Sequence, residues 1–477
     1  MTKELYASGE DFVIQGHWSR PGGQHRPAGD LKYKNGKLEL HLLGAFDDAE
    51  GRHSFERRMP EEEPAIIHGQ SAKGTPVTLL SSFYTKWQPA GGLFEEGPVP
   101  VRSSKLTCNG MLLGVHLQSE NEASFTKCAL TIPNLDRWLD DRPFEITMQK
   151  VESFSVAYTM PKKRTFEIPG WGKLHFSPSV TPPFHPWDDV TIRHRTYVQL
   201  EPDARRNFAW FVETAGEAER LFTLLFGRVV RVTQNQLSYS QGEDSVDAYV
   251  YLPTDRIAQP TMNPKDFMVR YTKIAEWFPQ MLKFWFCESA DIRHALDLVF
   301  SSMQRPGRFL ETRFMPFVQA VEVYSRAVDS GHIVDKTVYK PIREGLVKCI
   351  PADTPPELLQ AIVRSLGFAN DRTLRERMLA LIDGLLPKTR ELFCVNPEDF
   401  AKGVVDTRNF FTHYSSDPDK ALNSIALHWA TIKLQTMMKV LLLKRLGIPE
   451  PEVQDIVKSN YQLAQERRAW KEVPELP

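Results

Sequence analysis

One short segment of the chain, VVDTRNFFTHYSSDP at 404–418, combines three side chains that can handle a phosphate. It contains Arg408, Asn409 and His413. An arginine supplies a planar fork of donors for phosphate oxygens and keeps its charge throughout a reaction. A histidine near a cation can donate a proton and take one back close to neutral pH. The segment is therefore a candidate site for phosphate chemistry, and the alternative is three solvated residues on an ordinary helix.

The residues around this segment predict a helix that ends on it. Asn396 is a good N-cap and Pro397 suits the first helical position, so a helix should begin there. It must end before Pro418, because a residue that precedes proline is biased away from the helical conformation. A second helix of about 28 residues is expected to follow over 418–446. The candidate residues therefore lie in the last turns of the first helix.

Spacing decides which of the three side chains can meet. Asn409 and His413 are four positions apart and share a face of the helix. Arg408 and His413 are five apart, about 140° round the axis, so they flank a groove. The Arg–His spacing alone carries little weight, because Arg20 and His25 in RPGGQH have it too. That second pair lies in a Pro-Gly loop, where no helix holds the side chains in register.

Length and composition limit the classes of protein to which the chain can belong. A chain of 477 residues is long enough for two or three domains. A net charge of −1 argues against a bulk nucleic-acid coat protein but allows one local basic site. The five cysteines never occur in CxxC spacing, which favours reduced thiols over a disulfide framework or a zinc site. The N-terminus lacks an apolar signal core, and no apolar run reaches the roughly 18 residues of a membrane span. We therefore expect a cytoplasmic protein.

The period of the apolar residues changes near residue 255. Before it, short alternating runs predict strands, and Asn35-Gly36 in LKYKNGKLEL marks a hairpin. One helix is expected over 215–227, ending at its glycine. The Pro-rich stretch 177–187 is a candidate boundary between two β-rich subdomains. Further strands are predicted at AIIHG, PVTLLSSF, FSVAY, VTIRHRTYVQL, GRVVRVTQ and DAYVYL.

From residue 265 to the end, helical spacing dominates. The predicted fold is therefore α+β, with a β-rich domain over 1–255, a proline-marked linker over 256–264 and an all-α bundle over 265–477. Pro316 lies inside an apolar stripe that begins at Leu310, where we expect a kink or a restart. Further helices are predicted near 335–349, 355–368, 372–386, 397–414, 418–446 and 450–468.

Three other groups of residues allow a functional interpretation. A histidine- and aspartate-rich group has spacings that fit no standard metal-ligand pattern, so a metal is disfavoured. Six of the ten tryptophans precede residue 215, and core packing is favoured over a ligand-stacking platform. Four cations on the helix after the motif either guide RNA phosphates or form a solvated face. The first group is His175, His185, Asp188, Asp189 and His194, and the cations are Lys433, Lys439, Lys444 and Arg445.

Several segments together resemble a known family. RNFFTH at the end of a helix in a C-terminal bundle resembles the Arg-Asn-x3-His signature of HEPN domains, and FLETRFMPFVQAVEVYSR resembles a helix of ApeA-like HEPN domains. In the first half, GHWSRPG, AGDLKYKNGKLELHLLGAF and IIHGQSAKGTPVTLLSSF are similar to the ApeA N-terminal domain. The resemblance covers nearly the whole chain, and the order of the two halves matches.

This resemblance implies a metal-independent endoribonuclease of bacterial anti-phage defence by abortive infection. Arg408 and His413 would be the catalytic pair, and Asn409 their polar companion. In the implied reaction the RNA 2′-hydroxyl attacks its own phosphodiester, His413 acts as general acid or base, and Arg408 stabilises the transition state. RNA is the expected substrate, and no cofactor or metal is expected.

Because each chain has one motif, the resemblance also implies a homodimer or a higher even-numbered oligomer with a shared site. The N-terminal domain would sense a phage-derived trigger or another ligand. One departure concerns HEPN toxins that are paired with nucleotidyltransferases, which carry a tyrosine two positions after the histidine. Here Ser415 occupies that place and Tyr414 precedes it, which argues against this regulation. The alternative hypothesis is a non-catalytic HEPN-like scaffold that binds RNA, a nucleotide or a phage protein.

Overall fold

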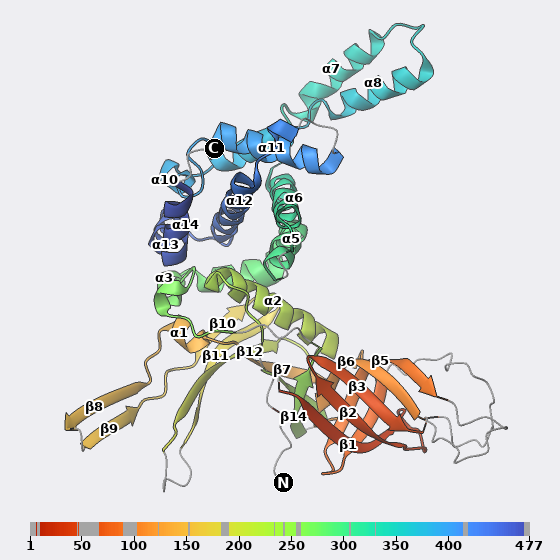
Figure 1. The fold of residues 1–477 in the computed structure, drawn as a ribbon, viewed down its shortest axis with the longest axis vertical. Helices are drawn as coiled ribbons and strands as arrows, with labels where there is room; N and C mark the ends of the chain where they lie inside the picture. The colour runs from red at the N-terminus through yellow and green to blue at the C-terminus, as the bar shows by residue number, and fades with distance from the viewer. Residues whose placement is uncertain are drawn as a thin grey trace, which may run out of the picture. The chain divides into compact units, whose positions relative to one another are not determined.

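The computed structural model contains two compact units, one rich in strands and one helical (Figure 1). The β-rich unit comprises Met1–Phe222 and Val230–Pro264, and the helical unit comprises Thr223–Val229 and Lys265–Pro477. The structure describes residues 6, 10–44, 46, 66–88, 103–122, 124–150, 153–182, 190–232, 234–241, 244–253, 259–304, 307–329, 331–413 and 418–471.

Six strands of the β-rich unit close into a small barrel (Figure 1). Their order is β6-β3-β2-β1-β4-β5, and β5 pairs back onto β6. Alternate side chains point inward, as the period of a strand requires, so Trp18, Leu31, Leu40 and Leu106 are buried in the barrel core. The strands are β1 (Phe12–Ser19), β2 (Ala28–Lys34), β3 (Lys37–Leu43), β4 (Ile66–Ser71), β5 (Pro76–Gln88) and β6 (Ser103–Leu113).

β6 also joins the barrel to an open part of the same sheet, with the order β10-β11-β12-β7-β13-β14-β6. The helix α2 (Phe208–Phe226) packs on this part through aromatic contacts: Phe211 meets Phe125 of β7, and Phe222 meets Phe176 of β11. The remaining elements are β7 (Phe125–Thr131), α1 (Leu135–Leu139), β10 (Arg164–Ile168), β11 (Gly172–Thr181), β12 (Arg193–Pro202), β13 (Gln234–Gln241), β14 (Asp244–Tyr251) and a separate hairpin of β8 (Phe144–Lys150) and β9 (Ser153–Tyr158).

Local signals predicted part of this unit. Asn35 and Gly36 have φ values of 50° and 74° and form the two-residue turn between β2 and β3, as expected. α2 ends before Gly227, as predicted, but it begins at Phe208 rather than near 215. Asn207 caps this helix by accepting a hydrogen bond from the backbone N–H of Trp210 (3.0 Å).

Two predictions for the β-rich unit differ from the structure. Residues 227–232 are not a strand, and β13 begins only at Gln234. Residues 177–181 of the Pro-rich stretch form the second half of β11, which pairs there with β12 alone. Pro178 is tolerated at this position because the edge of a sheet needs no N–H donor. The rest of that stretch, 183–187, lies outside the described residues.

The tryptophans of this unit pack mainly in its core. Trp18 and Trp138 are fully buried, Trp171 is nearly so, and Trp210 is half-buried. The prediction of core packing is therefore confirmed for the first three. The side chains of Trp87 and Trp187 lie outside the described residues.

The helical unit is a bundle in which α6 packs between α5 and α12. None of the helices that the structure describes combines the length and apolar character needed to cross a membrane. Its helices are α3 (Tyr271–Ile274), α4 (Phe278–Lys283), α5 (Arg293–Gln304), α6 (Leu310–Val328), α7 (Lys336–Lys348), α8 (Pro356–Phe368), α9 (Leu374–Asp383), α10 (Pro387–Arg390), α11 (Pro397–His413), α12 (Ser424–Arg445), α13 (Glu450–Ser459) and α14 (Tyr461–Lys471).

Three helix boundaries differ from the sequence-based expectation. α6 runs through Pro316 without a restart, so of the kink or restart expected there the restart is wrong. The helix expected from 418 begins as a single 3₁₀ turn, and α12 starts at Ser424 because Asn423 caps it through the backbone N–H of Ala426 (2.9 Å). The helix expected over 450–468 is divided at Asn460 into α13 and α14.

Two of the four cations on α12, Lys433 and Lys439, are not part of a solvated face, whereas Lys444 and Arg445 are exposed. Lys433 and Lys439 are buried, because most residues of α12 from Ala426 to Leu443 pack inside the bundle. The ammonium of Lys433 lies 4.5 Å from the ring centre of Trp470 and 5.6 Å from that of Phe400. Lys444 bonds to Glu450, and Arg445 to Asp291. Both sequence interpretations, RNA guidance and a solvated face, are therefore wrong for Lys433 and Lys439.

Burial of Lys433 should make stability depend on pH. Desolvation lowers the pKa of Lys433 from 10.5 to about 8, so between these values the unfolded chain holds a proton that the folded chain lacks. The free energy of unfolding of the wild type should therefore rise from pH 8 to 10.5, relative to Lys433→Met, by up to about 3 kcal/mol. Denaturant unfolding at several pH values measures this difference. Exposed Lys458→Met is the matched control, and an equal pH trend in both variants would contradict the assignment.

Candidate active site

α11 presents the candidate residues at its C-terminal end. Its start is the predicted one: the side-chain oxygen of Asn396 accepts hydrogen bonds from the backbone N–H groups of Glu398 (3.1 Å) and Asp399 (3.4 Å). The carboxylates of these two residues also interact favourably with the positive, N-terminal end of the helix dipole. One side of the helix is buried through Phe400, Ala401, Val404 and Thr407. The opposite side is left for polar residues.

Two contacts fix the last turns of α11 in the bundle. Thr407 is fully buried, and its hydroxyl donates to the Gly403 carbonyl (2.7 Å) while it accepts from the backbone N–H of Leu422 (2.9 Å). The ring of Phe411 meets that of Phe314 on α6 edge to face, with centres 6.3 Å apart. The chain that returns after the motif is thus tied to the helix that carries the motif.

Arg408 is held by neighbours on both sides. Its guanidinium donates to the side-chain oxygen of Asn409 (3.1 Å) and lies 3.9 Å from a carboxylate oxygen of Glu322 on α6. The other carboxylate oxygen of Glu322 accepts from Arg326 (3.1 Å). The Arg408 side chain is 33% exposed and that of Glu322 is 26% exposed. One carboxylate is therefore shared by two arginines, and the cluster keeps a net positive charge.

His413 stands apart from this cluster at the end of α11. It is exposed, and no residue that the structure describes holds it by a hydrogen bond or an ion pair. The structure therefore brings Arg408 and Asn409 into contact but leaves His413 open to solvent. Tyr414 and Ser415, which follow it, lie outside the described residues.

Glu322 is the member of the cluster that the sequence did not reveal. It lies 86 positions before Arg408, and no spacing rule links two residues on separate helices. A weak local signal exists, since Glu322 and Arg326 are four apart and pair as i,i+4 residues do. The pairing with Arg408 follows only from the packing of α11 on α6.

Two members of the histidine-rich group, His175 and His194, have local hydrogen-bond partners. His175 lies 2.9 Å from the Thr165 hydroxyl, and His194 lies 3.0 Å from the Tyr158 hydroxyl. Burial lowers the pKa of His175, with the charge of Lys163 acting in the same direction. His185, Asp188 and Asp189 lie outside the described residues. Among the residues that are described, no three metal-ligating side chains are grouped.

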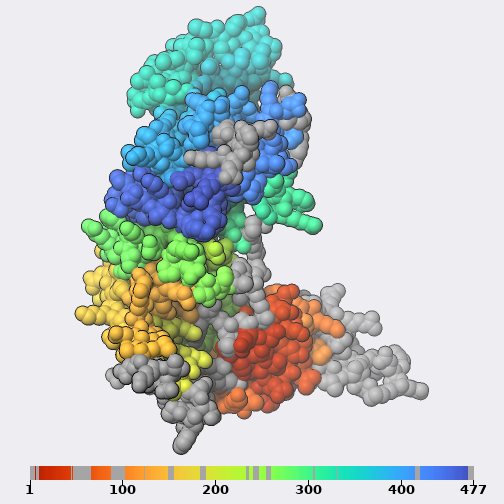
Figure 2. Space-filling view, turned by 60° about the vertical axis from the view of Figure 1, so that its left-hand side comes forward, coloured from red at the N-terminus to blue at the C-terminus, as the bar shows by residue number. Residues whose placement is uncertain are grey.

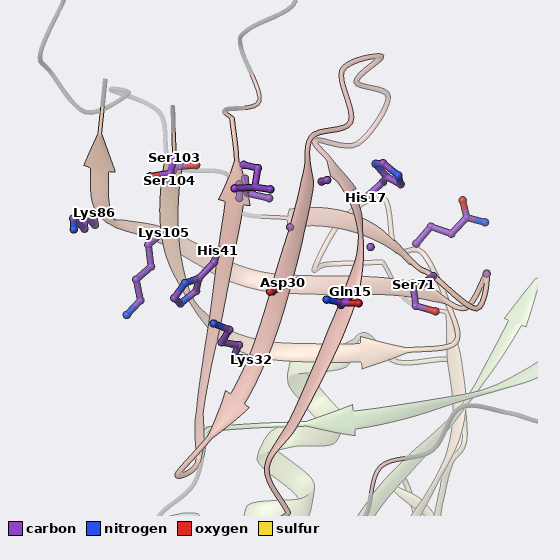
Figure 3. A pocket seen from close by; sticks show the side chains of 18 residues that line it. Gln15, His17, Asp30, Lys32, His41, Ser71, Lys86, Ser103, Ser104 and Lys105 are labelled. Carbon is purple, nitrogen blue, oxygen red and sulfur yellow. The ribbon is translucent and has the colours of Figure 1, made fainter. Parts of the chain in front are cut away.

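A groove of about 1080 Å³ lies on the outer face of the barrel (Figure 3). Strand pairing places one outward row across it, in which Lys86 faces Lys105, Lys105 faces His41, and His41 faces Asp30. Lys105 pairs with Glu39 (2.9 Å), whereas Lys86 has no ion pair among the described residues. Lys86 is therefore an exposed cation of the groove whose charge is available to an anionic group.

Comparison with known families covers both units. The family described as ApeA N-terminal domain 1 matches residues 13–285, more than half of the chain, and the family described as Apea-like HEPN matches residues 315–452. The second match contains α11 and the Arg408–His413 segment. No curated protein and no solved structure matches the chain. The chain therefore belongs to the ApeA-like HEPN family and is an HEPN-containing defence effector.

Proposed function

We propose that this protein is an endoribonuclease that cuts RNA without a metal, with Arg408 and His413 as catalytic residues and Asn409 as their polar companion. HEPN domains are generally ribonucleases, which supports the reaction class. The observation that carries the proposal is the arrangement at the end of α11, where a one-third-exposed, oriented arginine and an exposed histidine lie on the last turns of one helix. A solvated helix end would not require an arginine held from two sides.

In the proposed reaction the 2′-hydroxyl attacks the adjacent phosphorus, and the bond to the 5′-oxygen breaks. The products are a 2′,3′-cyclic phosphate and a 5′-hydroxyl. An imidazole removes the proton from the 2′-hydroxyl or donates one to the leaving oxygen. Arg408 stabilises the charge on the phosphoryl oxygens with its fork of donors. DNA lacks the nucleophile and is not cut.

Two copies of the chain are proposed to build one site. Each copy contributes one Arg408 and one His413, which lie about 140° apart round α11 and flank a groove. A two-fold partner supplies a second pair of the same residues. One His413 then acts as base while that of the other copy acts as acid. Glu322 orients Arg408 and is a positioning residue.

We further propose that the barrel groove receives the signal that activates the nuclease. The two lysines that face each other there, together with Ser103 and Ser104, suit a ligand that carries negative charge. This assigns the β-rich unit as the sensor and the helical unit as the effector of anti-phage defence by abortive infection. A scaffold without catalysis remains the second hypothesis, and the cleavage assay below separates the two.

Replacing either catalytic residue should remove RNA cleavage. We expect Arg408→Ala and His413→Ala to lower the rate by roughly 10²- to 10⁴-fold, because each loses acid–base or charge stabilisation. Cleavage of RNA in the presence of EDTA measures this directly. Exposed Lys402→Ala on the same helix should cut like the wild type. Wild-type rates in both site variants would favour the scaffold, and loss of wild-type activity in EDTA would refute metal independence.

Glu322→Gln should lower kcat by roughly 10- to 100-fold with little change in KM, because the arginine is misplaced but still present. Steady-state kinetics on a short RNA separate the two constants. Arg326→Ala is the matched control, since it removes the other partner of Glu322 and leaves the carboxylate free for Arg408. If Glu322→Gln raises KM alone, or if Arg326→Ala is equally impaired, the positioning role is wrong.

Reversing the charge of the groove should uncouple sensing from the nuclease. We expect the double variant Lys32→Glu, Lys86→Glu to lose protection of bacteria against phage, because an anionic ligand is then repelled. Plating efficiency of phage on cells with equal amounts of each variant is the readout. Lys37→Glu, on the same barrel but outside the groove, should protect normally. Full protection by the double variant would show that the groove is not the sensing surface.

A further inference from the structure

The helical unit contains a pocket of about 350 Å³, and the described residues that line it all belong to this unit. Its walls come from the segment 227–229, the end of α5, the start of α6 and the first half of α12. Figure 2 shows the α5–α6 part of this region, in spring green, at the surface of the unit. Ligand pockets begin at about 300 Å³, so this one has room for roughly a single nucleotide.

The pocket is lined by cations and open at its rim. Arg228, Arg313 and His428 can donate hydrogen bonds to an anion, and none of the described lining residues is acidic. Neither arginine has an ion pair among the residues that the structure describes. Arg228 and His428 are exposed, whereas Phe317, which also lines the pocket, is buried. Unpaired cations around a concave surface attract an anionic ligand.

Arg313 is oriented by a backbone carbonyl and not by a carboxylate. Its Nε–H donates to the carbonyl of Gly307 (2.6 Å), which leaves its two terminal nitrogens for a ligand. A Cβ at Gly307 would lie 2.0 Å from the Thr312 hydroxyl oxygen, so this close approach requires glycine. Because a carbonyl does not neutralise the guanidinium, the arginine keeps its full charge in a fixed orientation.

Arg228 is placed by the turn that ends α2. Gly227, just before it, has a φ of 78°, the left-handed conformation in which many helices end. The carbonyl of Leu225 accepts a hydrogen bond from the backbone N–H of Val269 (2.8 Å), and both residues belong to the helical unit. Arg228 is therefore held at a fixed point of the rim.

Part of the lining is apolar. Met303, Leu310, Phe317 and Ile432 line the pocket, and all four are buried or half-buried. Aromatic and aliphatic side chains can cover the flat face of a nucleobase, whereas a phosphate needs the arginines. A free inorganic phosphate would leave the apolar lining uncovered. The combination therefore fits a nucleotide unit.

The first half of α6 serves both this pocket and the candidate active site. Arg313 lines the pocket, and the next residue, Phe314, meets Phe411 of α11. Glu322, which holds Arg408, lies nine positions after Arg313, or about 14 Å along the helix. A few nucleotides of RNA cover such a distance, so one strand can occupy both places.

We propose that this pocket holds one nucleotide of the RNA substrate near the cleavage position, with Arg228 and Arg313 on its phosphate and its base against the apolar lining. The proposal rests on the proposed ribonuclease function and adds a substrate-binding site to it. The two arginines touch no reacting atom, so they stabilise the bound RNA and the transition state equally. The pocket therefore affects KM for RNA and leaves kcat unchanged.

Removal of both arginine charges tests the pocket in the full-length protein. Arg228→Ala with Arg313→Gln should raise the dissociation constant for a non-cleavable 2′-O-methyl RNA by roughly 10- to 100-fold, because charge-assisted hydrogen bonds to one phosphate are lost. The slope of log affinity against log salt should become shallower by roughly 0.7, the value for one phosphate of a single strand. Fluorescence anisotropy at several salt concentrations measures both. On cleavable RNA, KM should rise by a similar factor while kcat stays within about 2-fold of the wild type.

Arg364→Ala, at an exposed arginine of α8 outside the pocket, is the matched control and should bind RNA like the wild type. Arg228→Ala alone should show part of the effect, since Arg228 is exposed and its loss disturbs no packing. Thermal unfolding shows that each variant is folded.

Unchanged affinity and KM in Arg228→Ala, or a wild-type protein that does not bind the RNA, would overturn the proposal. Adenosine or uridine 5′-monophosphate that binds the wild type but not the double variant, with equal RNA affinity in both, would also overturn it and assign the pocket to a free nucleotide. Failure of the proposed function has a different signature: the wild type then binds RNA through this pocket but does not cut it.

Discussion

The packing of α11 on α6 is the contact on which the candidate site depends. Phe411 meets Phe314 across this contact, and Glu322 of α6 reaches Arg408 of α11. The hydroxyl of Thr407, with partners on both sides, ties the returning chain to the same helix. Without this packing, the end of α11 would fray as exposed helix ends do, and its arginine would have many orientations.

The electrostatics of the site follow from the same contact. A buried arginine with one dedicated carboxylate would be neutralised and poorly suited to bind a phosphate. Here Glu322 is shared between Arg326 and Arg408, and Arg408 is one-third exposed, so it is oriented while its charge remains available. The neutral side chain of Asn409 adds a second fixed contact without cancelling the charge.

The sequence predicted the features that are determined by residues close together in the chain. Asn396 with Pro397 marked the start of α11, and Asn35-Gly36 marked the hairpin, because caps and tight turns are set by local conformation. Prolines make the stretch 177–187 a candidate boundary because proline disfavours strands in general, whereas the edge position of residues 177–181 in β11 tolerates it. Such exceptions depend on which strand lies alongside.

Packing between distant segments could not be predicted, because it too depends on which elements lie alongside each other. Lys433 and Lys439 look like surface residues, and only the helices around α12 bury them. Glu322 carries no signal that links it to Arg408, since the two residues meet through separate helices. Of the candidate site, the positions of Arg408, Asn409 and His413 at the end of a helix could be predicted, but the carboxylate that orients the arginine could not.

The central claim is that the 2′-hydroxyl of the RNA attacks the adjacent phosphorus at a site formed by Arg408 and His413. The most direct measurement is the identity of the new ends when the purified protein cuts a defined RNA. The account predicts a 5′-hydroxyl on one fragment and a 2′,3′-cyclic phosphate on the other, and no cut where a single 2′-deoxynucleotide replaces the nucleotide at the cleavage position. A 3′-hydroxyl with a 5′-phosphate, or unimpaired cutting at the deoxy position, would contradict it.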